Sequence, residues 1–120
     1  MAQSKNRILN ALPQNIFAAV EPHLKHQALV FGAVVAETDQ PVDLAYFSDI
    51  GVVSLVVEMM VGDMIETAMV GRDGVVNGTS ALDGKVALHK GIVQIAGDAH
   101  VITSDALRGL ADEFDMAPDS

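Results

Sequence analysis

The chain contains no cysteine, which excludes disulfides, cysteine-ligated iron–sulfur clusters and cysteine nucleophiles. Basic residues are scarce as well: seven Lys and Arg stand against sixteen Asp and Glu, for a net charge of −9. Nucleic-acid binding takes most of its affinity from Lys and Arg side chains that neutralise phosphates. Because the seven basic residues form no run, we expect this chain to bind neither DNA nor an anionic membrane directly.

Long apolar runs and aromatic residues are also missing. No run approaches the ~18 residues that span a bilayer, and the first residues lack the apolar stretch of a signal peptide. We therefore expect a cytoplasmic protein. One Tyr, four Phe and no Trp leave a core that must be built from aliphatic side chains. Half of the 120 residues are apolar, which is enough for one folded domain.

Apolar residues at helical spacing mark both ends of the chain. Residues 1–23 are expected to form a helical cap in two pieces, which meet at Pro13 and end at Pro22. Residues 103–115 are expected to form a C-terminal helix, since Thr103 suits an N-cap and a stripe of apolar residues follows. The residues of that stripe are Leu107, Leu110, Ala111 and Phe114.

Between these helices, residues 24–102 alternate β-branched runs with glycines at spacings of about ten residues, which is typical of short strands. The clearest unit is a hairpin in which residues 52–60 pair with residues 64–70 through a turn at Gly62. The sequence therefore predicts a mainly β protein. Its single domain, residues 1–120, is expected to be a double-stranded β-roll of jelly-roll type with short helices at both termini.

Three stretches carry a resemblance to a known family. Residues 45–55 look like a strand-turn-strand unit around an aromatic pair and a glycine, and residues 69–76 look like the run into a phosphate-binding loop. Gly32 stands at the turn before the second roll strand. Over essentially its whole length, the chain resembles the cyclic-nucleotide-binding sensory domain of Crp/Fnr-type transcriptional regulators. The resemblance implies a β-roll that senses a ligand and regulates transcription or signalling.

Regulators of that type continue into a long dimerisation helix and a winged helix-turn-helix that reads DNA. The 120 residues contain no counterpart of either element, so the resemblance covers the sensory domain alone. The chain is expected to be either a stand-alone roll or a piece of a longer regulator.

The resemblance also places a ligand-binding cassette at residues 77–90. Its candidate ligand-binding residues are Asn77, Gly78, Thr79, Ser80, His89 and Lys90. In members that bind cyclic nucleotides, the cassette supplies a Glu for the ribose and an Arg for the phosphate. Gly78 stands at the Glu position, and His89 or Lys90 stands near the Arg position. A glycine accepts no ribose hydrogen bond, and neither other side chain reproduces the bidentate guanidinium. The resemblance thus implies a degenerate pocket that does not bind cAMP in the usual way.

The four histidines offer a metal site as another interpretation. His23 and His26 share a face if they lie on one helix, and His89 and His100 approach each other if they lie on neighbouring strands. The sequence has no His-x-His pair of the kind that a cupin metal site needs. Surface histidines explain these positions more simply, so we expect no metal, haem or other cofactor.

Catalytic motifs are weak. Ser80 follows Gly78 as in a nucleophile elbow, but Leu82 replaces the second glycine that the elbow requires. Glu58 and Glu66 are expected to face each other across the predicted hairpin. A solvated face of the strands explains both side chains without a catalytic role. We therefore expect no enzyme.

Three hypotheses follow from the sequence. The leading one is a non-enzymatic regulatory domain that acts through a small-molecule effector other than cAMP, or through a protein partner. The second is a structural or interaction module with a vestigial pocket, which forms a homodimer through an exposed strand edge or through the stripe of residues 107–114. The third is a cupin-like metal enzyme.

Overall fold

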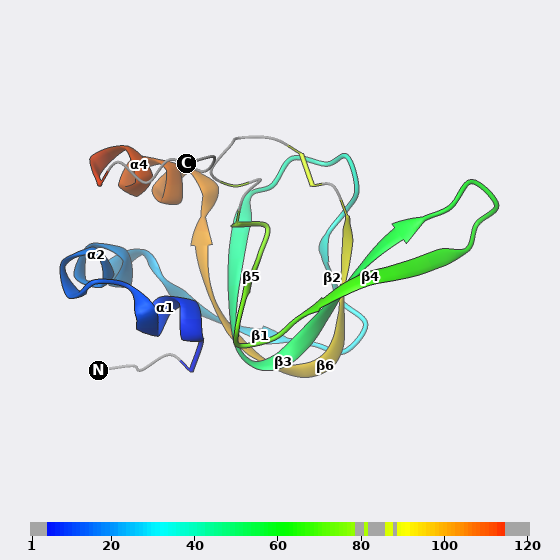
Figure 1. Cartoon of the computed structure of the whole chain (residues 1–120), viewed down its shortest axis with the longest axis horizontal. Helices are drawn as coiled ribbons and strands as arrows, with labels where there is room; N and C mark the ends of the chain where they lie inside the picture. The colour runs from blue at the N-terminus through cyan, green and yellow to red at the C-terminus, as the bar shows by residue number, and fades with distance from the viewer. Residues whose placement is uncertain (1–4, 79–80, 82–85, 88, 115–120) are drawn as a thin grey trace.

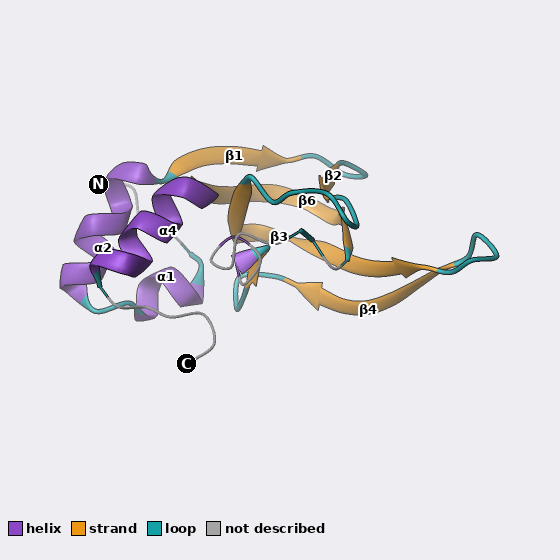
Figure 2. Cartoon of the chain, turned by 90° about the horizontal axis from the view of Figure 1, so that it is seen from above, coloured by secondary structure: helices purple, strands orange, loops and turns teal. Residues whose placement is uncertain are grey.

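The computed structural model describes residues 5–78, 81, 86–87 and 89–114. In chain order its elements are α1 (Arg7–Ala11), α2 (Gln14–Val20), the 3-10 turn η1 (Glu21–His23), β1 (Lys25–Leu29), β2 (Val34–Ala36), β3 (Leu44–Glu58), β4 (Met64–Val70), β5 (Val75–Val76), β6 (Lys90–Thr103) and α4 (Ser104–Glu113). The helices gather at one end of the molecule, and a hairpin of β3 and β4 projects from the other end (Figures 1 and 2). This arrangement confirms the predicted mainly β fold with short helices at both termini.

The described strands form one antiparallel sheet with the order β1-β6-β3-β4. The long strands β3 and β6 are its centre, and their pairing runs from Leu44 opposite Thr103 to Val56 opposite Lys90. Strand β1 pairs with the C-terminal half of β6, and β2 pairs with its first residues. Strand β4 has β3 on one side and no described strand on the other, so it is an edge of the sheet.

A close glycine contact bends the two long strands. The predicted turn within residues 45–55 is wrong, because the chain continues through Gly51 as one strand. Gly51 has a φ of +105°, and the register with β6 shifts beside it. A Cβ on Gly97 would lie 2.0 Å from the carbonyl oxygen of Ile50, so the strands approach this closely only without that side chain. The irregularity bends β3 without ending it.

The predicted hairpin is confirmed. Strands β3 and β4 pair with Val57 opposite Ile65. The Met59 N–H donates to the Asp63 carbonyl oxygen at 2.7 Å, and Gly62 supplies the positive φ of +93° that the turn needs. The two strands therefore stay hydrogen-bonded out to the tip.

The two glutamates of the hairpin do not face each other directly. Glu58 lies opposite Met64, and Glu66 lies opposite Val56. The Ser54 hydroxyl donates to Oε1 of Glu66 at 2.5 Å. The expected pairing of the two carboxylates is thus wrong by two positions, because the tight turn between Met59 and Asp63 sets a register that places Glu58 opposite Met64.

Two apolar clusters fill the interior, and β3 contributes to both. Phe47 belongs to a helix-side cluster, whereas its neighbour Tyr46 belongs to a roll cluster, since successive strand residues point to opposite faces. The helix-side cluster comprises Leu9, Val20, Ala45, Phe47, Ala81, Ile102, Leu107 and Leu110. The roll cluster comprises Leu29, Tyr46, Val53, Val76, Val93, Ala99 and Val101. Apart from Tyr46 and Phe47, both buried sets are aliphatic, as the composition predicts.

A buried polar network fastens the N-terminal helices to the sheet. Asn6 is fully buried; its Oδ1 caps α1 by accepting from the N–H groups of Ile8 and Leu9, at 2.9 and 3.2 Å. Its Nδ2 donates to the carbonyl oxygens of Ser48 and Gly74, both at 2.8 Å. One side chain therefore joins the first helix, β3 and the segment before β5.

The C-terminal helix closes the same end of the molecule. The Thr103 hydroxyl caps α4 by accepting from the Ala106 N–H at 3.2 Å. Leu107, Leu110 and Ala111 are buried, the two leucines within the helix-side cluster. The stripe of residues 107–114 is therefore no open dimer surface, because α1, α2 and the sheet already cover it. None of the described helices is long and apolar enough to cross a bilayer.

Candidate functional site

A cavity of about 260 Å³ opens between β2, the start of β3 and the cassette. Its apolar lining includes Leu44 and Tyr46 from β3, together with Val35 and Ala36 from β2. Its remaining lining residues are Val34, Glu37, Gln40, Pro41, Val42, Asp43, Asn77 and Ala87. A pocket with an apolar wall and a few polar groups is the usual form of a small-molecule site.

Asn77 fixes the entry to the cassette. It adopts a φ of +68°, which Asn tolerates better than most residues. Its Nδ2 donates to the carbonyl oxygens of Leu44 at 3.1 Å and Val35 at 3.4 Å. The side chain thus spans β2 and β3 at the cavity wall. The Ala81 N–H donates to the Asn77 carbonyl oxygen at 2.8 Å.

The far end of the cassette is attached to the loop between β2 and β3. The Asp39 N–H donates to the Ala87 carbonyl oxygen at 2.9 Å, and the Ala87 N–H donates to the Gln40 carbonyl oxygen at 3.0 Å. A β-bridge joins Pro41 to Val86. These bonds hold Ala87 against the loop, so that both contribute to the wall of the cavity.

The charge at the cavity is negative. Glu37 and Asp43 line it, and no Lys or Arg is present in the described part of the lining. Lys90 lies at the start of β6, with its Nζ 3.9 Å from Oε1 of Glu37 and 3.6 Å from Oε1 of Glu58. Its ammonium group is therefore shared between two carboxylates and gives no excess positive charge to hold a phosphate.

The predicted ligand-binding residues have different positions. Asn77 lines the cavity. His89 directly precedes β6 and Lys90 is its first residue, and neither belongs to the described lining. At Gly78, a Cβ would lie 2.8 Å from a methyl group of Val75. A larger residue there would have to displace the Val75 side chain, and the position carries no carboxylate for a ribose. Thr79 and Ser80 lie outside the described residues.

The histidines form a different pair from those that the sequence suggests. His23 ends η1 and His26 lies on β1, so the two share no helical face. His89 directly precedes β6 and His100 lies within β6, so the two are not on neighbouring strands. Instead, His26 lies opposite His100 across β1 and β6, with their ring centroids 6.2 Å apart.

Each ring of this histidine pair has its own carboxylate. His100 Nδ1 lies 2.5 Å from Oδ2 of Asp49, and His26 Nε2 lies 3.0 Å from Oδ1 of Asp98. Oδ1 of Asp49 also accepts from the Lys5 and Asn6 N–H groups, at 2.9 and 3.3 Å. The Asp49–His100 contact therefore belongs to the network that holds α1. Within the described part of the chain, no three His, Asp or Glu side chains are arranged to bind a metal ion.

Sequence reasoning missed most of the cavity. Glu37, Gln40 and Asp43 come from an irregular loop that has no periodic pattern, and only the folded sheet brings them to Asn77. Asn6 did leave a signal, since an Asn placed just before apolar residues at helical spacing is an N-cap pattern. Asp49 left a weaker one, because Asp is uncommon inside a strand unless a partner fixes it.

The sequence matches no protein-family model and no curated protein sequence. Its fold, however, matches solved structures. A cyclic nucleotide-binding-like protein from Brucella abortus matches with a TM-score of 0.72 at 14% identity, over 88% of this chain and 90% of that one. The N-terminal domain of a transcriptional regulator from Streptomyces coelicolor matches with a TM-score of 0.74 at 18% identity, over 93% of this chain and 79% of that one. The catabolite activator protein of Thermus thermophilus matches with a TM-score of 0.74 at 12% identity, over 91% of this chain and 51% of that one. The chain therefore has the fold of the cyclic-nucleotide-binding domains, the fold that its resemblance to Crp/Fnr-type regulators implies.

Proposed function

We propose that the chain is a non-enzymatic regulatory domain of Crp/Fnr type whose pocket binds a small neutral or cationic effector in place of a cyclic nucleotide. The observation that carries this proposal is the cavity beside the cassette, whose described lining contains Glu37 and Asp43 but no basic residue. A cyclic phosphate brought to this wall would meet carboxylates of its own charge, and like charges disfavour binding.

The connection between cassette and C-terminal helix supports a sensing role. Ala81, in the cassette, is fully buried among residues of the helix-side cluster. Its carbonyl oxygen accepts from Nη1 of Arg108 at 3.2 Å, and Nη2 of the same guanidinium lies 2.6 Å from Oδ1 of Asp105. A ligand that moves the cassette would therefore act on α4 through one hydrogen bond and one packed contact. We infer that α4 is the element that reports effector binding.

A thermal-shift comparison tests this function. The panel consists of cAMP, cGMP, small organic acids, neutral polyols and small organic cations. A ligand at ~100 times its Kd stabilises the fold by about 2.7 kcal/mol, which gives a readily measured rise in melting temperature. We expect this rise with a member of the neutral or cationic classes. Saturable binding of cAMP would contradict the proposal.

Two charge-neutralising variants localise the effect. Glu37→Gln with Asp43→Asn changes the cavity wall, so a cationic effector should lose at least about tenfold in affinity, or about 1.4 kcal/mol. Glu58→Gln is the matched control. Like Glu37, Glu58 is an ion-pair partner of Lys90, but it lies outside the described lining. Equal losses in both variants would place the ligand outside this cavity.

An interaction module with a vestigial pocket is the second candidate. A specific observation favours it, namely the apolar hairpin that projects from the roll, with Met60 fully exposed at its tip. On either proposal the chain does not bind DNA itself, since its net charge of −9 opposes phosphate contact.

A further inference from the structure

The end of the β3–β4 hairpin extends beyond the rest of the sheet. Strand β6 pairs with β3 only as far as Val56, where Lys90 begins β6. The following segment, residues 57–65, is called the projecting hairpin here; it leaves the roll as a two-stranded ribbon (Figure 1). Four residues at ~3.3 Å each give a reach of about 13 Å beyond the last β6 partner.

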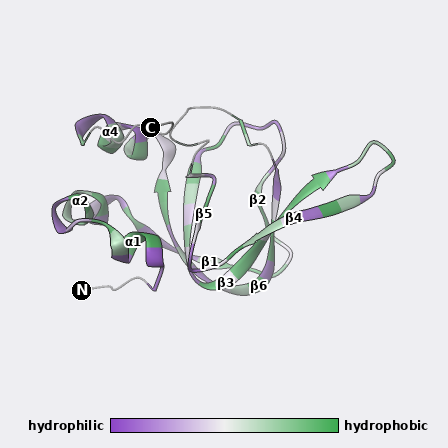
Figure 3. Cartoon of the chain, viewed as in Figure 1, coloured by the Kyte–Doolittle hydropathy of each residue, from purple (hydrophilic) through white to green (hydrophobic). Residues whose placement is uncertain are grey.

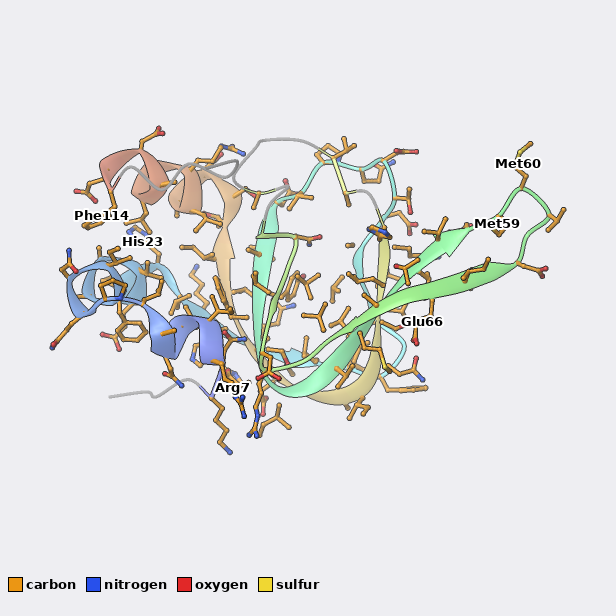
Figure 4. All side chains as sticks on the ribbon, in the orientation of Figure 1. Arg7, His23, Met59, Met60, Glu66 and Phe114 are labelled. Atoms are coloured by element: carbon orange, nitrogen blue, oxygen red, sulfur yellow. The ribbon has the colours of Figure 1, made fainter. Side chains whose placement is uncertain are left out.

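This ribbon is unusually apolar for a segment in water. Met59, Met60, Val61, Met64 and Ile65 are all at least 45% exposed. Figure 3 shows hydrophobic residues continuing into the ribbon, and Figure 4 shows the Met59 and Met60 side chains at its outer end. A cluster of exposed large apolar side chains commonly marks an interaction site. Methionine suits such a site because its flexible, polarizable side chain adapts to a partner surface.

One face of the ribbon extends the inner surface of the roll. Residues that lie directly opposite in paired strands share a face, so Val57 and Ile65 share one. Because side chains alternate along β3, this is also the face of Val53, which is fully buried in the roll cluster. The face that is covered at Val53 is thus open at Val57, where the sheet no longer curls over it.

The charges on the hairpin define the chemistry of what covers it. Residues 57–70 include Glu58, Asp63 and Glu66 and no Lys or Arg. A second copy of the chain would bring the same three carboxylates and a further net charge of −9. Like charges brought together across an interface oppose association, so self-pairing is disfavoured. An anionic bilayer is disfavoured on the same ground.

An added strand is disfavoured by the backbone of β4. Its register with β3 is interrupted between Ala68 and Glu66, which leaves Thr67 as an extra residue. The Thr67 hydroxyl donates to the Leu55 carbonyl oxygen at 3.2 Å. Such a bulge breaks the regular spacing of the outer edge, and edge bulges obstruct strand pairing. A partner can still bind to the side chains on the face of the ribbon.

We propose that the projecting hairpin is a docking surface for a partner protein, which presents an amphipathic helix with an apolar stripe bordered by Lys and Arg. The apolar stripe covers Val57, Met59 and Ile65, and the basic border faces Asp63, which lies opposite Met59 at the end of the ribbon. A ribbon reach of ~13 Å matches about nine helical residues at ~1.5 Å each. The surface is separate from the cavity, so this docking does not depend on the effector proposed above.

A pair of helix-stabilised peptides tests the proposal on the full chain. Both have a Leu stripe at helical spacing over about 14 residues; one has Lys and Arg beside the stripe and the other has Glu. Fluorescence anisotropy should show saturable binding of the basic peptide and at least about tenfold weaker binding of the acidic one. Equal binding of the two peptides, or no binding of the basic one at millimolar concentration, would overturn the proposal.

Matched variants locate the contact. The double variant Met60→Ser with Ile65→Ser should bind the basic peptide at least about tenfold more weakly, since a few large side chains carry most of the binding energy of an interface. A second variant, Met59→Ser with Val61→Ser, should do the same if the first fails to fold. Phe31→Ser is the control, because Phe31 is 68% exposed on a different loop. An equal loss in the control, or a dimer of the chain alone that the hairpin variants abolish, would refute the assignment.

Discussion

The two ends of strand β3 differ sharply. At its start, Ala45 and Phe47 are buried in the helix-side cluster and Tyr46 is buried in the roll cluster. The Ser48 carbonyl oxygen and the Asp49 carboxylate accept hydrogen bonds from the N-terminal segment. At its end, Val57 is exposed, and so are the apolar side chains of Met59, Met60 and Val61 that follow it. One continuous strand therefore passes from a region held by packing and hydrogen bonds to a region held by little beyond its own hairpin. Stability is concentrated at the first end, and the second is left available for contact with other molecules.

The largest expected effect comes from the glycine contact between these two regions. Gly97→Ala would place a Cβ 2.0 Å from the Ile50 carbonyl oxygen and 2.4 Å from its carbon, both of which are backbone atoms that cannot rotate away. We expect a loss of about 4 kcal/mol or more in the free energy of unfolding. Urea denaturation followed by circular dichroism measures it.

Gly62→Ala is the control for that substitution. Gly62 also has a positive φ but has no atom within 4 Å of the position of a Cβ. The left-handed backbone alone should cost about 1 kcal/mol. Comparable losses at the two glycines would mean that backbone conformation, and not the close approach of β3 and β6, sets the requirement at Gly97.

The polar network at the closed end should produce the next largest effect. Asn6→Ala removes the cap of α1 and leaves the Ser48 and Gly74 carbonyl oxygens without their Asn6 donor, so we expect a loss of about 3 kcal/mol. Arg7→Ala is the nearby control. The Arg7 guanidinium pairs with Asp73 at 2.9 Å, but both side chains are mostly exposed, and such pairs contribute less than about 1 kcal/mol. Thermal and urea unfolding of the two variants give the comparison; equal losses would mean that Asn6 does not anchor the helix.

The sequence predicted the parts of this molecule that local patterns specify. The helix cap, the hairpin about Gly62 and the helix after Thr103 each have a periodicity or a turn residue that marks them. The sequence predicts a turn at Gly51 where the structure has a bend, because a glycine within β-branched residues is typical of both features. What distinguishes them is Gly97, which is forty-six positions away and touches Gly51 only in the fold.

The candidate site was harder to predict for the same reason. The lack of a carboxylate at Gly78 can be predicted from the sequence, but the position of Glu37 and Asp43 in the cavity wall cannot. Those side chains belong to a loop whose place is set by backbone bonds from Asp39 and Gln40 to Ala87. Long-range contacts of this kind also explain the histidine error, since the pairing of His100 with β1 depends on strand order and not on spacing.

Two valines in β3 test the comparison on residues of one type. Val53 is fully buried and Val57 is 37% exposed, four residues further along the same strand. Val53→Ala should cost about 2 kcal/mol, because it removes buried methyl groups and leaves a cavity. Val57→Ala should cost about 0.5 kcal/mol or less, as surface substitutions do. Urea midpoints of the two variants measure the difference, and similar losses would show that the projecting hairpin is covered in the isolated chain.

The smallest effect should be a gain at the closed end. Gly109 lies inside α4, and no atom lies within 4 Å of where its Cβ would be. Gly109→Ala should therefore stabilise the protein by about 1 kcal/mol through helix propensity alone. Amide hydrogen exchange shows where the gain acts: protection should rise across α4 and stay unchanged in residues 57–65, because the hairpin opens locally without the helices. If exchange in the hairpin slowed to the same extent, the two ends of β3 would open as one cooperative unit, and the division between a stabilising end and a free end would be wrong.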